Sequence, residues 1–374
     1  MPVSVSEEDL LRVLAAQHLP GAQVLTLDLG DDESGHVNPV SLVRAAESQR
    51  LLGPLQEAVE SGRLLIPAAA REYLAARQAA TMLWCLQIEV RLLELCEWFA
   101  EAGGVEFRVI KGPAVAHLDE LDPALRSFAD LDLLVAADDL DRAVAVLEAH
   151  GATRPWPQRR PAFDRRFAKS VTMTCQDSVE VDLHRTLCDG AYGVRLPLAE
   201  LFRDVESFEL GGEQIRALSA PHRMLHAAYH AVLGSRTPRL SSLRDIAGYL
   251  TTPELGPEFI VPTAERWRGV EVLAVAVEET FDALHFSAPV WTDWLADAEL
   301  DRQQLEVIER HRREGSSFGR AKLDLWHELP GAAAKLAYGR AVIWPTSAHL
   351  RERGLRRADP VKSLLGRWRS PQRG

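Results

Sequence analysis

The chain contains 374 residues, of which 47% are hydrophobic, and it carries a formal net charge of −11. This length allows two or more domains or layers, and the hydrophobic content is sufficient for a sizeable core. The negative balance disfavours non-specific binding to nucleic acid. No apolar run approaches the length of a membrane span and the N-terminus has no signal-peptide pattern, so we expect a cytoplasmic protein without a membrane span.

The cysteines and the distribution of charge add two expectations. Buried free thiols in a reducing compartment explain the four cysteines, because they show no metal-binding spacing: Cys85, Cys96, Cys175 and Cys188. Residues 351–374 contain eight basic and two acidic residues, a net charge of +6. This basic tail is either a solvated terminus or a contact for RNA, an acidic partner or a membrane surface.

Helical patterns occupy both ends of the chain, and strand patterns occupy its middle. Apolar residues recur with helical spacing from about 40 to 102, as far as Gly103-Gly104, and again from 218 to 340. The sequence therefore predicts an α+β fold in which a small mixed sheet lies between two helical blocks. The predicted divisions are a helical region at 1–103, an α/β core at 104–217, a helical domain at 218–350 and the basic tail at 351–374.

A predicted strand at 105–110 ends in the turn Lys111-Gly112-Pro113, after which a helix begins. Gly lets the backbone approach closely, and Pro suits the first position of a helix. A strand, a glycine turn and a helix N-terminus can together bind an anionic phosphate, and Lys111 could add a charge there. The same pattern also fits an ordinary strand-to-helix turn.

Two aspartates one residue apart are the most informative feature of the chain. Asp130 and Asp132 lie in the stretch 127–135, which alternates as a strand does, so both side chains are expected on one face. Adjacent carboxylates repel, and burying them unpaired is costly, whereas a bound divalent cation removes that conflict. The pair therefore indicates a metal site of the kind that phosphate chemistry uses.

A hairpin is predicted from residues 170–175 and 179–184, which alternate on either side of a polar turn. In its second strand Glu180, Asp182 and His184 share one face. A third acid beside the aspartate pair would complete a three-carboxylate metal site, and Asp182 is the candidate. A solvated strand face is the alternative.

Three histidines share one face of a later predicted helix, because His222, His226 and His230 recur at intervals of four residues. This face could bind a metal or line a nucleotide pocket. Packing and capping roles explain the same spacing.

The order of these pieces resembles the nucleotidyltransferases of the DNA polymerase β superfamily, and more narrowly a bacterial family of uncharacterised nucleotidyltransferases. The resemblance covers roughly residues 40–350. It rests on Ile110-Lys111-Gly112, on Arg126 through Val135 and on Val181-Asp182-Leu183-His184. Later pieces that also fit are 218–221, 225–230 and 243–246.

The resemblance implies a nucleotidyltransferase core that transfers a nucleotide with two metal ions. Asp130 and Asp132 would hold Mg²⁺ against the triphosphate of ATP or another NTP. Asp182 would help to place the second ion and activate the acceptor hydroxyl. The residues that it suggests for nucleotide binding are Lys111, Gly112, Arg126, His184 and His230, with Asp245 as a further residue of the cleft.

The turn before the acids departs from the wider superfamily, which has a Gly-Ser turn shortly before its aspartates. Here Pro113 follows Gly112, and 17 residues separate Gly112 from Asp130. The narrower family tolerates a Lys-Gly turn at about this distance. Arg126 and Lys111 are the candidates to neutralise phosphate charge.

The leading hypothesis is a Mg-dependent enzyme that moves an NMP, with AMP from ATP as the first choice, to a hydroxyl of a small-molecule or protein acceptor. One alternative is a toxin-like transferase that acts on tRNA through the tail and a basic run: Arg159, Arg160, Arg165, Arg166 and Lys169. Another alternative is a non-catalytic nucleotide-binding protein. The acidic net charge favours a small-molecule or protein acceptor over RNA.

Overall fold

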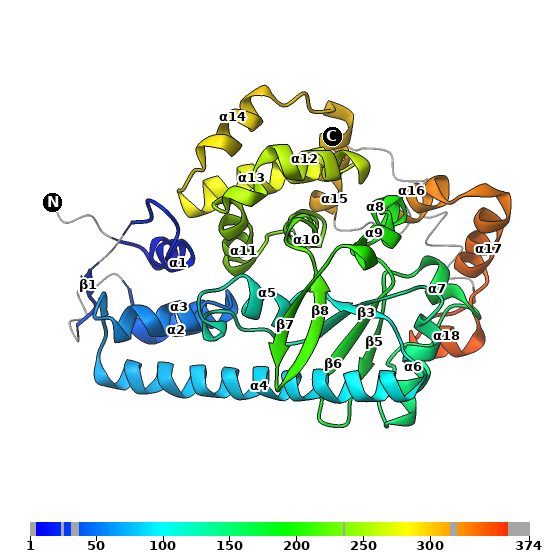
Figure 1. Ribbon diagram of the computed structural model, residues 1–374, viewed down its shortest axis with the longest axis horizontal. Helices are drawn as coiled ribbons and strands as arrows, with labels where there is room; N and C mark the ends of the chain where they lie inside the picture. Colours follow the sequence, from blue (N-terminus) through cyan, green and yellow to red (C-terminus); the bar gives the residue numbers. More distant parts are fainter. Residues whose placement is uncertain (1–4, 24–25, 31–36, 235, 315–319, 358–374) are drawn as a thin grey trace.

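A six-stranded mixed sheet lies at the centre of the computed structural model, with helices on both of its faces (Figure 1). The structure describes residues 5–23, 26–30, 37–234, 236–314 and 320–357, and among these no helix is both long and apolar enough to cross a membrane. The six-stranded mixed sheet with its flanking helices confirms the predicted α+β fold. Its strands, in spatial order, are β5 (Ser170–Thr174), β6 (Glu180–His184), β4 (Leu131–Val135), β3 (Phe107–Val109), β8 (Glu213–Leu218) and β7 (Val205–Leu210).

The sheet is mixed because hairpins and crossovers alternate along it. The pairs β5–β6, β3–β4 and β7–β8 are antiparallel, which confirms the predicted hairpin. The pairs β4–β6 and β3–β8 are parallel. Parallel strands need a long connection, and between β4 and β6 this connection includes α6 (Leu140–Ala149).

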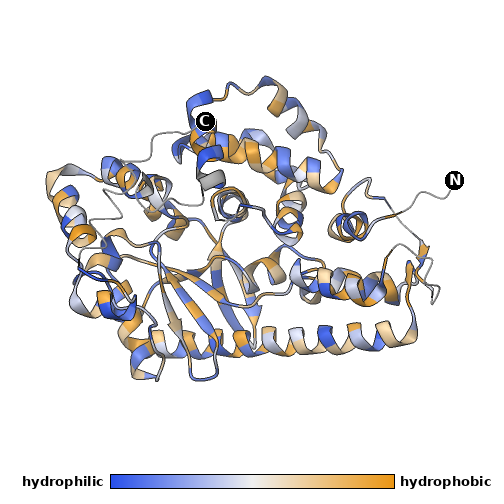
Figure 2. Ribbon diagram, turned by 180° about the vertical axis from the view of Figure 1, so that it is seen from behind, coloured by the Kyte–Doolittle hydropathy of each residue, from blue (hydrophilic) through white to orange (hydrophobic). Residues whose placement is uncertain are grey.

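One face of the sheet is covered by α4 (Ala68–Glu101), which runs below the strands in Figure 1, and by α6. Leu131, Leu133 and Val135 of β4 point into this core, where they meet Ile88 and Leu92 of α4. These apolar strand residues are the alternate ones, and the aspartates lie between them. In Figure 2 hydrophobic and hydrophilic residues accordingly alternate along the strands.

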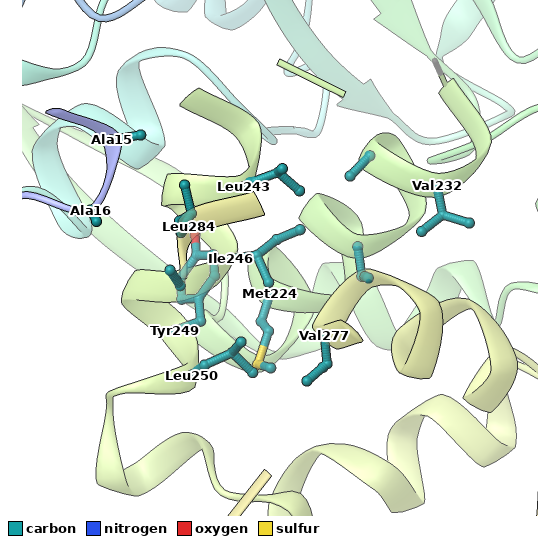
Figure 3. Packing of buried hydrophobic residues seen from close by; sticks show 14 of the residues in the cluster. Ala15, Ala16, Met224, Val232, Leu243, Ile246, Tyr249, Leu250, Val277 and Leu284 are labelled. Carbon is teal, nitrogen blue, oxygen red and sulfur yellow. The ribbon is translucent and has the colours of Figure 1, made fainter. Parts of the chain in front are cut away.

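The other face of the sheet meets a helical block. Its centre is formed where α10 (Ala220–Gly234), α11 (Leu240–Leu250) and α13 (Val270–Leu284) converge, and Figure 3 shows Met224, Ile246 and Val277 packed together there. Ile110 and Leu134, on the opposite side of their strands from the α4 core, join this second core. Side chains on this face of β4 therefore point toward the helical block.

The remaining elements surround these two cores. The N-terminal part contributes α1 (Glu7–Ala15), β1 (Leu27–Asp28), α2 (Pro39–Ser48), α3 (Leu52–Glu60) and β2 (Leu64–Leu65). The middle contributes α5 (Pro113–Leu118), η1 (Pro123–Leu125), α7 (Phe163–Phe167), α8 (Gly190–Arg195) and α9 (Leu198–Arg203). The last third adds η2 (Pro253–Leu255), α12 (Pro257–Arg266), α14 (Pro289–Asp297), α15 (Arg302–Glu314), α16 (Arg320–Glu328), α17 (Gly331–Ile343) and α18 (Ser347–Glu352). Of the predicted basic tail, residues 358–374 lie outside the described part.

The turn between β3 and α5 depends on Gly112. Its φ is +54°, and a Cβ atom there would lie 3.3 Å from Phe128 Cβ and Cγ and 3.6 Å from the Asp130 carbonyl oxygen. Only glycine tolerates this combination of backbone angle and close approach. The turn is therefore pressed against the segment that leads into β4.

We expect Gly112→Ala to lower the free energy of unfolding by about 2 kcal/mol or more, because it adds both backbone strain and a tight contact. Gly62→Ala is the matched control, since Gly62 has a φ of +71° but nothing within 4 Å of the position that a Cβ atom would take. It should cost about 1 kcal/mol. Urea denaturation checks both values, and equal losses would contradict the packing role of Gly112.

Candidate functional site

Asp132 and Asp182 lie side by side because β4 and β6 pair in parallel with these two residues in register. Ligand atoms of Asp132, Asp182 and His184 all lie within 4.8 Å of one another. A carboxylate pair at this separation, with an imidazole beside it, has the spacing of a cation site. The structure thus brings together two of the three predicted acids and one predicted nucleotide-binding residue.

Asp132 is held ionised although it is only 3% exposed. Burial alone would raise its pKa, but the Lys111 ammonium and a hydrogen bond from His184 hold the pKa well below its usual value. Lys111 Nζ lies 3.3 Å and His184 Nε2 lies 2.7 Å from the same oxygen, Oδ1. The second oxygen of Asp132 forms neither of these two bonds.

His184 and Thr172 fix the orientation of the two carboxylates. His184 is fully buried, and its other ring nitrogen, Nδ1, lies 3.3 Å from the Thr186 carbonyl oxygen. Thr172 Oγ1 donates to Asp182 Oδ1 at 2.5 Å. Both carboxylates are therefore supported by neighbouring strand residues, as the ligands of metal sites commonly are.

Asp130 differs from Asp132 in its surroundings. It immediately precedes β4 and stands outside the group of ligand atoms within 4.8 Å. Partial burial and the nearby charge of Asp132 raise its pKa, although Arg50, whose Nη2 lies 3.9 Å from Asp130 Oδ1, acts in the opposite direction. The two neighbouring aspartates thus have pKa values shifted in opposite directions.

A hollow between the sheet and the helical block opens onto Asp130 and Asp132. Its walls come from the end of β3, the Lys111-Gly112 turn, the approach to β4, α10 and the start of α11. It is lined by Arg50, Ile110, Lys111, Gly112, Val115, Arg126, Phe128, Asp130, Asp132, Arg223, His226, Ala227, His230, Arg239, Ser241, Ser242 and Asp245. The hollow thus contains Lys111, Gly112, Arg126, His230 and Asp245, all of which the sequence suggested.

Arg126 forms a buried two-point ion pair with Asp245. Its Nε and Nη2 atoms each lie 2.8 Å from one oxygen of Asp245, and Nη1 donates to the Ser127 carbonyl at 2.6 Å. These partners engage the guanidinium group on three sides. The pair joins the segment before β4 to α11, so Arg126 fixes the wall of the hollow as well as contributing charge.

The three predicted histidines of one helix face have different surroundings. His222 contacts Ser219 and Glu200, whereas His226 and His230 line the hollow. His226 Nδ1 donates to the Ile110 carbonyl at 3.0 Å, so Nε2 carries the lone pair, and it has no hydrogen-bond partner among the described residues. Burial and the charge of Lys111 hold the pKa of both His226 and His230 well below the usual value.

Arg50, Arg239 and Ser241 of the hollow were not predicted from the sequence. Arg50 follows α2, and the other two lie at the start of α11, about 190 residues later. No sequence signal marked Arg50, because the helical periodicity expected from about 40 to 102 runs through it, whereas the structure ends α2 at Ser48.

We expect the free energy of unfolding to fall as the pH is lowered from about 6.5, because the unfolded chain binds protons that buried His226 and His230 do not. For each histidine the slope is about 0.7 kcal/mol per pH unit at pH 6.5 and approaches about 1.4 kcal/mol per pH unit below about pH 5.5. Urea denaturation between pH 7 and 5.5 should show a smaller slope for His226→Gln than for the wild type. His327→Gln, at an exposed ring, is the control, and an unchanged slope in His226→Gln would contradict the assignment.

Comparison with known proteins identifies the family. The model of the uncharacterised nucleotidyltransferase family matches residues 36–277, a range that contains the whole sheet, α10 and α11. No curated protein and no solved structure matches the chain. Since the match covers well over half of the 374 residues, the chain belongs to the uncharacterised nucleotidyltransferase family.

Proposed function

We propose that the protein transfers an NMP, with AMP from ATP as the first choice, to a hydroxyl of a small-molecule or protein acceptor. The observation that carries this proposal is the pairing of Asp132 with Asp182, in which Asp132 also lines a hollow with several cationic side chains. Carboxylates suit Mg²⁺, and cationic side chains suit the phosphates of a nucleotide. Membership of a nucleotidyltransferase family supports the reaction class.

The residues present fit a divalent cation. Asp132 and Asp182 would be its main protein ligands, and Asp130, which lines the hollow, would join them. Because His184 already donates to Asp132, we assign it to orienting that carboxylate rather than to binding the metal. Two Mg²⁺ ions bound there would stabilise both the attacking and the leaving oxygen of an in-line displacement at the α-phosphate.

Other side chains would bind and orient the reactants. Lys111 lies close enough to Asp132 to neutralise phosphate charge beside the carboxylates. Asp182, the more accessible member of the pair, would orient and activate the acceptor hydroxyl. Arg126 and Asp245 would keep the wall of the hollow in position, and Gly112 would leave space there.

Two observations bear on the alternatives. In the basic run suggested for tRNA binding, Arg159 lies over the ring of Phe163 and Arg166 over the ring of Phe167. Arg165 is 3.5 Å from Asp141, so these cations have partners within the chain.

The four cysteines are free, three of them buried and Cys96 half-buried, which agrees with a reducing compartment. We therefore keep a cytoplasmic enzyme with a non-RNA acceptor as the proposal.

With Mg²⁺ and cell extract, label from the α-phosphate of ATP should appear on an acceptor, and pyrophosphate should be released. Asp132→Ala and Asp182→Ala should lower the transfer rate by roughly 100-fold or more, because each removes a metal ligand. Asp130→Ala should also abolish transfer. Scintillation counting of the labelled product measures all three.

Glu180→Ala is the matched control, since Glu180 lies two residues before Asp182 on β6 but is exposed and outside the cation cluster. It should transfer at the wild-type rate. Label that moves from the γ-phosphate instead would identify a kinase and would contradict the proposed reaction.

A further inference from the structure

The hollow contains positive charges that the carboxylates there do not balance. Lys111 is paired with Asp132 and Arg126 with Asp245, while Arg223 is bound to Asp119 and Glu206 outside the hollow. This leaves the side chains of Arg50 and Arg239, which form no hydrogen bond with any residue of the described chain. The carboxylate nearest to Arg50 in that part of the chain is Asp130, whose Oδ1 lies 3.9 Å from Arg50 Nη2, beyond hydrogen-bonding distance.

The pKa of Arg50 shows the effect of this excess of positive charge. Burial lowers the pKa of its guanidinium group, Asp130 acts against this, and the positive charges of Arg126 and Arg239 lower the pKa further. Three guanidinium groups thus influence one another across a partly buried space. A bound anion would remove the repulsion between them.

The backbone of Arg50 adopts a conformation that is unfavourable for arginine. Its φ is +57°. The Arg50 N–H donates to the Glu47 carbonyl at 3.0 Å, and the Leu51 N–H donates to the Ala46 carbonyl at 2.8 Å. These two bonds form the Schellman ending of α2, in which the residue at the Arg50 position is usually glycine. Arg50 thus adopts an unfavourable backbone conformation while its side chain lines the hollow.

A second contact places Arg50 beside the start of α11. Gln49 Oε1 accepts a hydrogen bond from the Leu240 N–H at 2.9 Å, which fixes the end of α2 against this helix. Ser241, in the first turn of α11, is 1% exposed and lines the hollow, yet its Oγ has no hydrogen-bond partner among the described residues. A buried hydroxyl without a partner is unfavourable, and a helix N-terminus attracts anions.

We propose that Arg50, Arg239 and Ser241 form the binding site for the β- and γ-phosphates of the nucleotide. This inference rests on the proposed function. Guanidinium groups and a hydroxyl are donors that match phosphate oxygens. These three residues line the same hollow as Asp130 and Asp132, and Arg50 Nη2 lies 3.9 Å from Asp130 Oδ1, so the site is next to the carboxylates.

The decisive variant is Arg50→Gly, because it removes the cation and relieves the backbone strain at the same time. Isothermal titration calorimetry with Mg²⁺ should show affinity for inorganic tripolyphosphate and for ATP that is on the order of 10- to 100-fold weaker than that of the wild type. Affinity for AMP, which lacks these phosphates, should change by less than about 3-fold. The melting temperature should stay equal or rise, since glycine suits the positive φ. Ser241→Ala should weaken tripolyphosphate binding in the same direction.

Arg44→Ala is the matched control, since Arg44 is an exposed residue of α2, which ends shortly before Arg50, and it does not line the hollow. It changes the net charge equally and should bind tripolyphosphate as the wild type does. Unchanged tripolyphosphate affinity in Arg50→Gly would overturn the inference. An equal loss for AMP, an equal loss in Arg44→Ala, or no binding of tripolyphosphate by the wild type would overturn it as well.

These outcomes are separable from those of the transfer assay. Binding of tripolyphosphate that depends on Arg50, in a chain that transfers no α-phosphate, would support the phosphate site and contradict the proposed reaction. Active transfer together with unchanged binding in Arg50→Gly would support the reaction and contradict the phosphate site.

Discussion

The parallel register of β4 and β6 is the constraint on which the site depends. It places Asp132 beside Asp182 at the face of the sheet that meets the helical block, while the alternate residues of β4 fill the α4 core. Two neighbouring carboxylates there are unfavourable unless cations compensate them. In the chain itself Lys111 and His184 supply this compensation to Asp132. A shift of β6 by one residue against β4 would turn Asp182 to the opposite face of the sheet, away from Asp132.

The helical block completes the site because buried ion pairs fix it against the sheet-bearing part of the chain. Arg126 and Asp245 are 119 residues apart in the sequence, and Arg244–Glu120 and Arg223–Asp119 connect similarly distant segments. These pairs position α10 and α11 over the aspartates. Carboxylates from the sheet side and cationic side chains from the helices therefore line the same hollow. This arrangement suits a polyphosphate bound with a metal ion.

Much of this arrangement could be predicted from the sequence, because it follows from local periodicity. Alternation in 127–135 and 179–184 predicted that Asp132 and Asp182 lie on strands, and the order of motifs predicted the family, which the comparison confirmed. The adjacency of Asp132 and Asp182 was a hypothesis based on the need for a third carboxylate in a metal site, since local spacing does not determine which strands pair. The pairing of Arg126 with Asp245 and the approach of Arg50 to Ser241 depend on how distant segments pack, and no local pattern encodes that. Strand ends were also less predictable, since β3 covers 107–109 of the expected 105–110.

The most direct test of the central claim is a titration with Mn²⁺ in the presence of a non-hydrolysable ATP analogue, followed by electron paramagnetic resonance. The wild type should bind Mn²⁺ saturably. Asp132→Asn and Asp182→Asn should each lose most of this binding, and Glu180→Gln should retain it. Mn²⁺ binding that is the same in Asp132→Asn, Asp182→Asn and the wild type would contradict a cation site between β4 and β6.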